Sequence, residues 1–341
     1  MTKDIETRAL FVGCGGMARN HLRIILSEFT NTHIPVVCEP SDESFNETCK
    51  IFEENGRPLP HNEPDLEKLL LQYGQVLDAA FIVTPHSLHF HQVKRCLESG
   101  LDVIVEKPMV MTAQQAEVLI KTRDSTGKLL VVAFQGSLSP QVRKAVEILN
   151  SGKLGEVRNI SGLMVQDWKA RSEGKWRQDP SISGGGFLFD SGAHLLNTIS
   201  DLAREDFTHV SAFFNNLNRP VEITAAILGK LRSGVLVSLN GCGDTYETAD
   251  SDLRVYCTNG ALKVDAWGKF LYQQTNKSEG WKSIPLPESK GVWEQFLLVR
   301  NGDLVNPSPP ELGLRMARLW DAIKESASND GKMISIDNVG H

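Results

Sequence analysis

ALFVGCGGMA, residues 9–18, joins an apolar run to a glycine-rich loop. The loop reads G-x-G-x-x-A, with an expected strand before it and an expected helix after it. Gly13 permits a tight turn, Gly15 lets the backbone approach a pyrophosphate, and Ala18 is small enough for the helix to pack on a sheet. The helix N-terminus would offer free N–H groups to the phosphates. In this context the motif predicts a dinucleotide-binding Rossmann domain.

Apolar runs and helical patterns alternate through the first third of the chain. Near-continuous apolar strands separated by helices are typical of a parallel sheet covered on both faces. Right-handed crossovers then give a doubly wound fold. The expected strands are Ala9–Val12, Ile34–Cys38, Ala79–Val83, Val103–Val105 and Leu129–Phe134, and the expected helices are Met17–Phe29, Pro64–Tyr73, His89–Ser99 and Thr112–Thr126.

The pattern changes near Gln135. Helical patterns cover Pro140–Asn150 and a stretch through His194. From Phe207 to about Pro285 the chain alternates apolar and polar residues between turn signals, which is typical of an antiparallel sheet. Further helical stretches follow at 292–300 and 312–327. We therefore expect an open, mostly antiparallel sheet with helices on one of its faces.

Length and composition bound the classes of protein that the chain can belong to. Its 341 residues exceed one ordinary core, so we expect a Rossmann domain over 1–135 and an α+β domain for substrate binding and oligomerisation over 136–341. The formal net charge is −6 without a run of Lys or Arg, which argues against nucleic acid as a partner. No apolar stretch could span a bilayer and none resembles a signal peptide, so no membrane partner is expected. Six cysteines without a C-x-x-C motif predict reduced thiols in a cytoplasmic protein.

The second expected strand ends at Glu39. A carboxylate at that position can accept hydrogen bonds from both hydroxyls of an adenosine ribose, and it would repel a 2′-phosphate. The cofactor is therefore expected to be NAD rather than NADP. The alternative is a solvated carboxylate at the turn before Pro40.

Three further motifs follow expected strands or precede an expected helix. TPHSLH, residues 84–89, follows the fourth strand, EKP, residues 106–108, follows the fifth, and GGGFLFDSGAH spans residues 184–194. With the glycine loop, they resemble the glucose–fructose oxidoreductase / inositol dehydrogenase / MocA family, whose pattern is T-P-x-x-x-H, E-K-P and G-G-G-x-x-x-D-x-G-x-H. The resemblance covers about the first 200 residues and, weakly, the sheet beyond.

The resemblance implies an oxidoreductase that transfers hydride between NAD(H) and a secondary hydroxyl or ketone of a sugar, cyclitol or related polyol. The family carries its active-site lysine, aspartate and histidine at the positions of Lys107, Asp190 and His194. On a helix the last two would share one face, and the carboxylate would raise the basicity of the imidazole. Cofactor contacts are expected from Gly13, Gly15, Gly16, Met17, Glu39, Thr84, Pro85, His89, Glu106, Lys107, Gln135, Trp176 and Arg177.

Some of these residues allow other interpretations. Trp176 could stack on a sugar or nicotinamide and Arg177 could clamp an anionic group, but core packing fits both equally well. The histidines between residues 86 and 91 lack the Cys or carboxylate that would complete a metal site, so no metal is expected. QGSL, residues 135–138, lacks the basic residues that the family often carries there, which argues against a strongly anionic substrate. Asn197 replaces an aspartate of many relatives.

Two other functions occur on this fold. One is an NAD-dependent glycosidase without net redox, and the other is a non-enzymatic dinucleotide-binding regulator such as the yeast galactose-pathway repressor, which resembles the family. The presence of Lys107, Asp190 and His194 favours an enzyme. An antiparallel sheet with one face uncovered by helices exposes apolar area, so we expect a homodimer or homotetramer.

Overall fold

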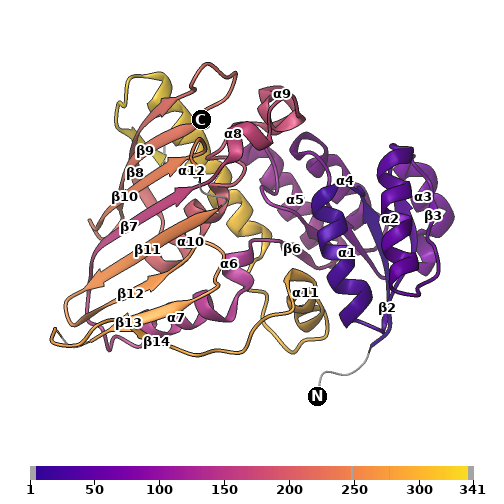
Figure 1. Ribbon diagram of the computed structural model, residues 1–341, viewed down its shortest axis with the longest axis horizontal. Helices are drawn as coiled ribbons and strands as arrows, with labels where there is room; N and C mark the ends of the chain where they lie inside the picture. The colour runs from indigo at the N-terminus through magenta and orange to yellow at the C-terminus, as the bar shows by residue number, and fades with distance from the viewer. Residues whose placement is uncertain (1–4, 247–248, 276, 337–341) are drawn as a thin grey trace. The chain divides into compact units, whose positions relative to one another are not determined.

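The computed structural model describes residues 5–246, 249–275 and 277–336 (Figure 1). These residues form two compact units. The first comprises the described residues of Met1–Val110, Gln114–Ala133 and Ser289–Gly313. The second comprises Met111–Ala113, Phe134–Glu288 and the described residues of Leu314–His341. Each unit has its own sheet.

The first unit contains a six-stranded sheet in the order β3-β2-β1-β4-β5-β6, and every neighbouring pair is parallel. This confirms the predicted doubly wound Rossmann fold. Strands β1, β4 and β6 are almost wholly buried because helices cover them. The strands are β1 Thr7–Val12, β2 Thr32–Cys38, β3 His61–Asn62, β4 Ala79–Ile82, β5 Asp102–Val105 and β6 Leu130–Val132, and the helices are α1 Gly16–Glu28, α2 Asp42–Glu54, α3 Leu66–Tyr73, α4 His86–Glu98 and α5 Ala113–Thr126.

The sequence patterns missed α2 and the short strand β3. Helix α2 has a narrow apolar stripe, since only Thr48, Ile51 and Phe52 of its thirteen residues are buried. Its start is fixed instead by local polar chemistry. The Ser41 side chain accepts a hydrogen bond from Ser44 N, and acidic residues fill the first turn, where the helix dipole favours negative charge.

The segment 289–313 joins the first unit, although the sequence had placed it in a domain spanning 136–341. Its helix α11, Val292–Arg300, buries Trp293, whose ring stacks on Phe81 with centroids 6.0 Å apart. Trp293 Nε1 also donates to Thr32 Oγ1 at 3.1 Å, and Arg300 Nε donates to Asp102 at 3.0 Å. The sequence pattern predicted a helix at 292–300, but periodicity does not tell which sheet a helix covers.

The second unit contains a nine-stranded sheet in the order β14-β13-β12-β11-β7-β10-β9-β8-β15, seen as the broad array of magenta and orange arrows in Figure 1. Only β7 and β10 pair in parallel among its described strands, so the predicted mostly antiparallel sheet is confirmed. The strands are β7 Val157–Val165, β8 Phe207–Asn215, β9 Thr224–Leu231, β10 Leu236–Cys242, β11 Asp250–Cys257, β12 Gly260–Val264, β13 Leu271–Gln274, β14 Lys282–Ser283 and β15 Ile334–Ser335.

Helices cover one face of this sheet, as predicted. Helix α10, Ala193–Ala203, packs on β7 and β11, and α7, Pro140–Asn150, packs on β12 and β13. Helix α12, Pro310–Ser328, buries Trp320 against Phe214 of β8 with ring centroids 5.9 Å apart. Along β9 buried and more exposed residues alternate strictly, which is the pattern of a strand with one covered face. The short helices are α6 Gln135–Leu138, α8 Trp168–Arg171 and α9 Pro180–Ser183.

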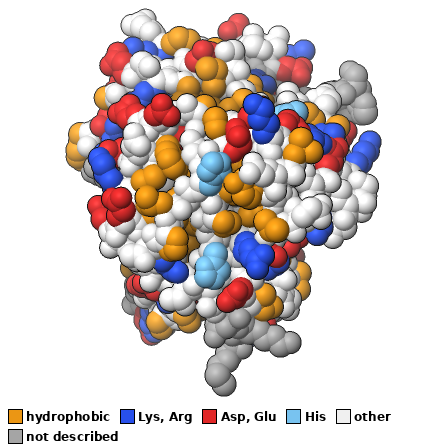
Figure 2. Space-filling view, turned by 90° about the vertical axis from the view of Figure 1, so that its right-hand side faces the viewer, with side chains coloured by type: hydrophobic (Ala, Val, Ile, Leu, Met, Phe, Trp, Pro, Cys, Tyr) orange, Lys and Arg blue, Asp and Glu red, His pale blue; other side chains and the backbone are white. Residues whose placement is uncertain are grey.

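The surface on the side of α2 and α3 mixes charges of both signs with scattered apolar side chains (Figure 2). Arg95 of α4 bridges Glu67 of α3 at 2.7 Å and Glu98 of its own helix at 2.8 Å. Exposed pairs of this kind contribute little to stability and keep the surface well solvated. Within the described part of the chain, no helix combines the length and apolar character needed to cross a membrane.

Candidate active site

The glycine loop between β1 and α1 has the geometry of a phosphate cradle. Gly13 has a φ of +91°, and a Cβ atom there would lie 2.5 Å from the carbonyl oxygen of Val83, so only glycine fits. Gly15 and Gly16 are different, because a Cβ atom at either position would meet nothing within 4 Å. The protein's own packing therefore does not require them. Open space beside the unprotected N-terminus of α1 fits a bound pyrophosphate.

Glu39 lies at the carboxyl end of β2 and closes this loop. Its side chain is 8% exposed. Cys14 N donates to its Oε2 at 2.6 Å and Ser41 N donates to its Oε1 at 2.8 Å. The carboxylate is thus fixed against the backbone of the glycine loop, and its expected contact with an adenosine ribose stays a prediction. The side chain is not solvated, as the alternative had it, but its bond to Ser41 N does cap the turn at Pro40.

His89 joins the turns that follow β4 and β5. It is fully buried, with Nδ1 2.8 Å from the carbonyl oxygen of Pro108 and Nε2 2.9 Å from that of Thr84. Burial lowers its pKa to about 4, while the two carbonyl oxygens, which accept from ring N–H groups, oppose that fall. The residue was predicted to contact the cofactor, but its burial leaves no ligand-facing atom. It positions Thr84 and the turn that holds Lys107.

Glu106 is held beside Lys107 by a residue that the sequence did not single out. His21 of α1 lies with Nε2 2.7 Å from Glu106 Oε1, and Lys107 N donates to Glu106 Oε2 at 3.1 Å. The His21 ring also packs on Phe81 with centroids 4.8 Å apart. Helix α1 thereby ties the glycine loop to the E-K-P turn. Lys107 is half-buried, and Met17 on the first turn of α1 is 45% exposed.

In the second unit, Asp190 lies in the turn before α10 rather than on it, and His194 is the second residue of that helix. The prediction that the two residues share one helix face is therefore wrong. Three glycines, a residue type that disfavours helix, precede the turn, and the turn closes through its own bonds. Asp190 N donates to the carbonyl of Gly186 at 2.9 Å, and His194 N donates to that of Ser191 at 3.2 Å.

Asp190 is 4% exposed, and its carboxylate is fixed by one side chain from α8 and one from the turn before α9. Its Oδ2 accepts from Trp168 Nε1 at 2.9 Å and from Arg177 Nε at 3.0 Å. The Arg177 guanidinium lies over the Trp176 ring, 4.4 Å from its centroid, and remains about one-third exposed. Arg177 and Trp176 are therefore part of a polar cluster and not of the core. The sequence missed Trp168, which no motif marks.

Gln135 is exposed at the start of α6, and a buried network anchors the residues behind it. Asn197 Nδ2 donates to Ser137 Oγ at 2.6 Å, and Asn197 Oδ1 accepts from Arg315 at 3.0 Å. Ser137 donates to Asp201 Oδ2 at 2.5 Å. The amide at position 197 thus acts as donor and acceptor at once, a combination that a carboxylate cannot supply.

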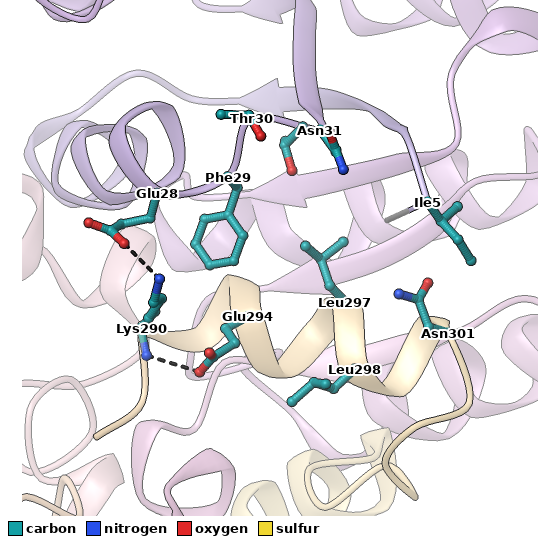
Figure 3. Close-up of a pocket in the computed structure, with 11 residues that line it drawn as sticks. Ile5, Glu28, Phe29, Thr30, Asn31, Lys290, Glu294, Leu297, Leu298 and Asn301 are labelled. Carbon is teal, nitrogen blue, oxygen red and sulfur yellow. Dashed lines mark hydrogen bonds and ion pairs between the residues drawn. The ribbon is translucent and has the colours of Figure 1, made fainter. Parts of the chain in front are cut away.

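A cavity of about 270 Å³ lies at the opposite end of the parallel sheet (Figure 3). Its lining includes Ile5 before β1 and Asn31 before β2, whereas the glycine loop and Glu39 follow those strands. Lys290 Nζ pairs with Glu28 across its rim at 2.8 Å. It contains none of the predicted site residues. Ligands of doubly wound sheets bind at the carboxyl ends of the strands, so this cavity is not the candidate site. No three metal-ligating side chains gather anywhere in the described residues.

Comparisons with known proteins bear on the family and the fold of the chain. The sequence model described as oxidoreductase family, NAD-binding Rossmann fold, matches residues 7–134, and the GFO/IDH/MocA C-terminal domain matches residues 142–263. Among solved structures, an inositol dehydrogenase homolog complexed with NAD+ from Azotobacter vinelandii aligns with a TM-score of 0.82 at 18% identity, covering 97% of both chains. A levoglucosan dehydrogenase in complex with NADH and levoglucosan aligns with a TM-score of 0.82 at 19% identity, covering 96% of this chain and 98% of that one.

Curated relatives are sugar and cyclitol dehydrogenases. D-xylose 1-dehydrogenase [NADP(+)] of Haloarcula marismortui is 32% identical over 36% of this chain, and the match spans only 34% of that protein. The scyllo-inositol 2-dehydrogenase (NADP(+)) of Bacillus subtilis is 22% identical over 81% of this chain and 84% of its own length. Both halves of the chain match models of one family and its motifs lie in the expected places of the fold. The chain belongs to the GFO/IDH/MocA oxidoreductase family.

Proposed function

We propose that the protein transfers hydride between NAD(H) and a secondary hydroxyl or ketone of a sugar, cyclitol or related polyol. The observation that carries this proposal lies at the carboxyl ends of the strands of the parallel sheet. There the open glycine loop, the Glu39 carboxylate bonded to it and the turns at Thr84 and Glu106 follow four neighbouring parallel strands. This is where a doubly wound sheet binds a dinucleotide.

The residues present fit a dinucleotide, and they favour NAD over NADP. Gly13, Gly15 and Gly16 would hold the pyrophosphate, with Met17 on the first turn of the helix beside it. The oxygens of Glu39 would accept bonds from the ribose hydroxyls, and a 2′-phosphate there would meet a buried negative charge. The remainder of the dinucleotide site would be lined by Thr84, Pro85 and the backbone around Glu106.

Each proposed catalytic residue has a separate role. His194 takes the proton of the substrate hydroxyl as general base, and Lys107 donates a hydrogen bond that stabilises negative charge developing on the oxygen. Bound NAD(H) supplies the nicotinamide that accepts or donates the hydride. Asp190 is paired with Arg177 and Trp168, so we assign it to orienting a neighbouring hydroxyl rather than to proton transfer. Gln135 provides an exposed amide.

One assay separates this function from the two others that the fold allows. The purified protein is mixed with NAD and a panel of polyols and aldoses, and absorbance at the reduced-nicotinamide band is followed. A dehydrogenase gives a lasting increase with at least one substrate. A glycosidase releases product without a lasting change, and a regulator gives neither product nor absorbance. A panel that covers cyclitols, pentoses and hexoses without any increase would contradict the proposal.

We further propose that the protein assembles as a homodimer or homotetramer through the uncovered face of the second sheet. Side chains that point to that face include four exposed apolar residues, Leu163, Phe213, Leu228 and Leu236. Leu228 is 65% exposed in the middle of β9. Light scattering at micromolar concentration measures the assembly, and a monomer would contradict it.

All six cysteines are free thiols, which supports a reducing, cytoplasmic location.

A further inference from the structure

Glu222 is a buried carboxylate outside every motif of the sequence. It lies just before β9 and is 5% exposed. Its Oε2 accepts from Gly186 N at 2.7 Å, and its Oε1 accepts from Phe189 N at 3.3 Å. Both donors belong to the glycine-rich segment that ends in Asp190. The two oxygens of one side chain therefore hold both ends of a four-residue stretch of backbone.

The backbone of Glu222 holds the same segment. Phe187 N donates to its carbonyl oxygen at 2.9 Å, and a Cβ atom at Gly186 would overlap that oxygen. Glycine at position 186 is therefore required by this close approach. Gly186 is also bonded directly to a residue of the candidate site, because its carbonyl oxygen accepts a hydrogen bond from Asp190 N at 2.9 Å.

Burying a charged carboxylate at this position costs free energy of desolvation. Burial raises the pKa of Glu222 to about 7, and the backbone N–H groups of Gly186 and Phe189 oppose that rise. A carboxylate accepts at both oxygens, whereas a glutamine amide accepts at only one and presents an NH₂ group to the second donor. A glutamine at this position would therefore leave one of the two backbone donors facing another donor.

We propose that Glu222 is a positioning residue that sets the place of the Asp190 carboxylate by holding the turn from Gly186 to Phe189. This inference deepens the proposed function and rests on it. Trp168 and Arg177 orient the Asp190 side chain, and Glu222 fixes the backbone from which that side chain extends. Its effect falls on polyol turnover and leaves dinucleotide binding alone, since the glycine loop and Glu39 belong to the other unit.

Glu222→Gln tests this role. It keeps the size of the side chain and removes one of its two acceptors, so kcat/KM for the polyol should fall by about tenfold. The Kd for NADH, measured by fluorescence titration, should stay within about twofold of the wild-type value. Glu222→Asp retains the charge but draws it back by one methylene, and it should give a smaller loss of the same kind. It also serves if the glutamine variant does not fold.

Glu205→Gln is the matched control. Glu205 also accepts hydrogen bonds from a loop, since Ser233 N donates to it at 2.8 Å. That loop follows the last residue of β9, whereas Glu222 precedes the first residue of the strand. The control should keep kcat/KM within about twofold of wild type. Loss of NADH affinity in step with kcat/KM in the Glu222 variants, or full activity in both, overturns the inference.

Hydrogen exchange separates this inference from the proposed function. In Glu222→Gln the amides of residues 184–192 should exchange faster than in the wild type, while those of the glycine loop stay unchanged. If the wild-type protein oxidises no polyol, the proposed function fails but the exchange experiment still decides the role of Glu222. Unchanged exchange over residues 184–192 overturns that role in either case.

Discussion

The two groups of site residues are built in different ways. In the first unit, Gly13, Glu39, Thr84 and Glu106 follow the ends of neighbouring parallel strands, and the side chains of His21 and His89 add contacts to two of them. In the second unit, Trp168 and Arg177 hold the Asp190 side chain, and Glu222 holds the backbone that precedes it. The first group follows mainly from topology, whereas the second depends mainly on individual side chains. Substitutions should therefore separate the functions of the two groups.

Lys107→Ala should give the largest effect. It removes the donor proposed to stabilise the alkoxide, so turnover should fall by about 10²–10³. NADH affinity should remain, because the phosphate and ribose contacts lie at other residues of the first unit. Steady-state kinetics and a fluorescence titration measure the two quantities, and Lys121→Ala on the exposed face of α5 is the control. Near-full turnover in both Lys107→Ala and His194→Ala would show that the proposed site is wrong.

Glu222→Gln should change how stability depends on pH. The folded-state pKa is raised from 4.5 to about 7, so the stability linked to protonation is fully present below pH 4.5 and is lost as pH rises through about 7. The loss amounts to about 3 kcal/mol at most. Urea unfolding at pH 5 and pH 8 measures it.

The comparison is made against the wild type at each pH, because His89 titrates in the opposite sense. Its lowered pKa costs stability as pH falls below 6.5. The difference between wild type and Glu222→Gln cancels that contribution. An equal difference at both pH values would contradict the raised pKa of Glu222.

Arg177→Ala should act on the substrate alone. It leaves the buried Asp190 carboxylate without its charged partner, so kcat/KM for the polyol should fall by about 10- to 100-fold. NADH affinity should stay within about twofold. Arg171→Ala removes a more exposed arginine at the end of α8 and is the control. A loss of NADH affinity instead would restore the cofactor contact that the sequence suggested for Arg177.

Glu39→Ser should give the most selective effect. Without the carboxylate, the preference for NAD over NADP should relax by about 1–3 kcal/mol. Titration of both oxidised cofactors measures the preference, with Glu63→Ser as a control on a neighbouring acidic residue of the same unit. Tighter binding of NADP than NAD by the wild-type protein would refute the role of Glu39 in discrimination.

The sequence placed the first group correctly in the fold because its signals are local. A glycine loop after an apolar strand marks a turn, and strand order brings Glu39 to that turn. Helix α2 was missed because its start depends on Ser41 capping rather than on an apolar stripe. His89 was predicted at the correct place but with the wrong role, since pattern does not reveal that a ring is buried.

The second group could be predicted only in part. The motif located Asp190 and His194, but spacing alone suggested one helix where the glycines impose a turn. Trp168 and Glu222 carry no local signal. Their roles arise from hydrogen bonds that span 22 residues in one case and 36 and 33 in the other, and a single sequence contains no record of such pairings.

The return of residues 289–313 to the first unit has a consequence for biosynthesis. Trp293 covers Phe81 and bonds to Thr32, yet the ribosome makes strands β7 to β14 before α11 emerges. The apolar surface of the nascent parallel sheet that Trp293 will cover is therefore exposed to solvent while the second sheet is translated. A fragment ending near residue 135 would keep that surface exposed permanently, and we expect it to require a chaperone or to aggregate. The first unit can be completed only after the segment 289–313 has been translated, although its glycine loop is translated first.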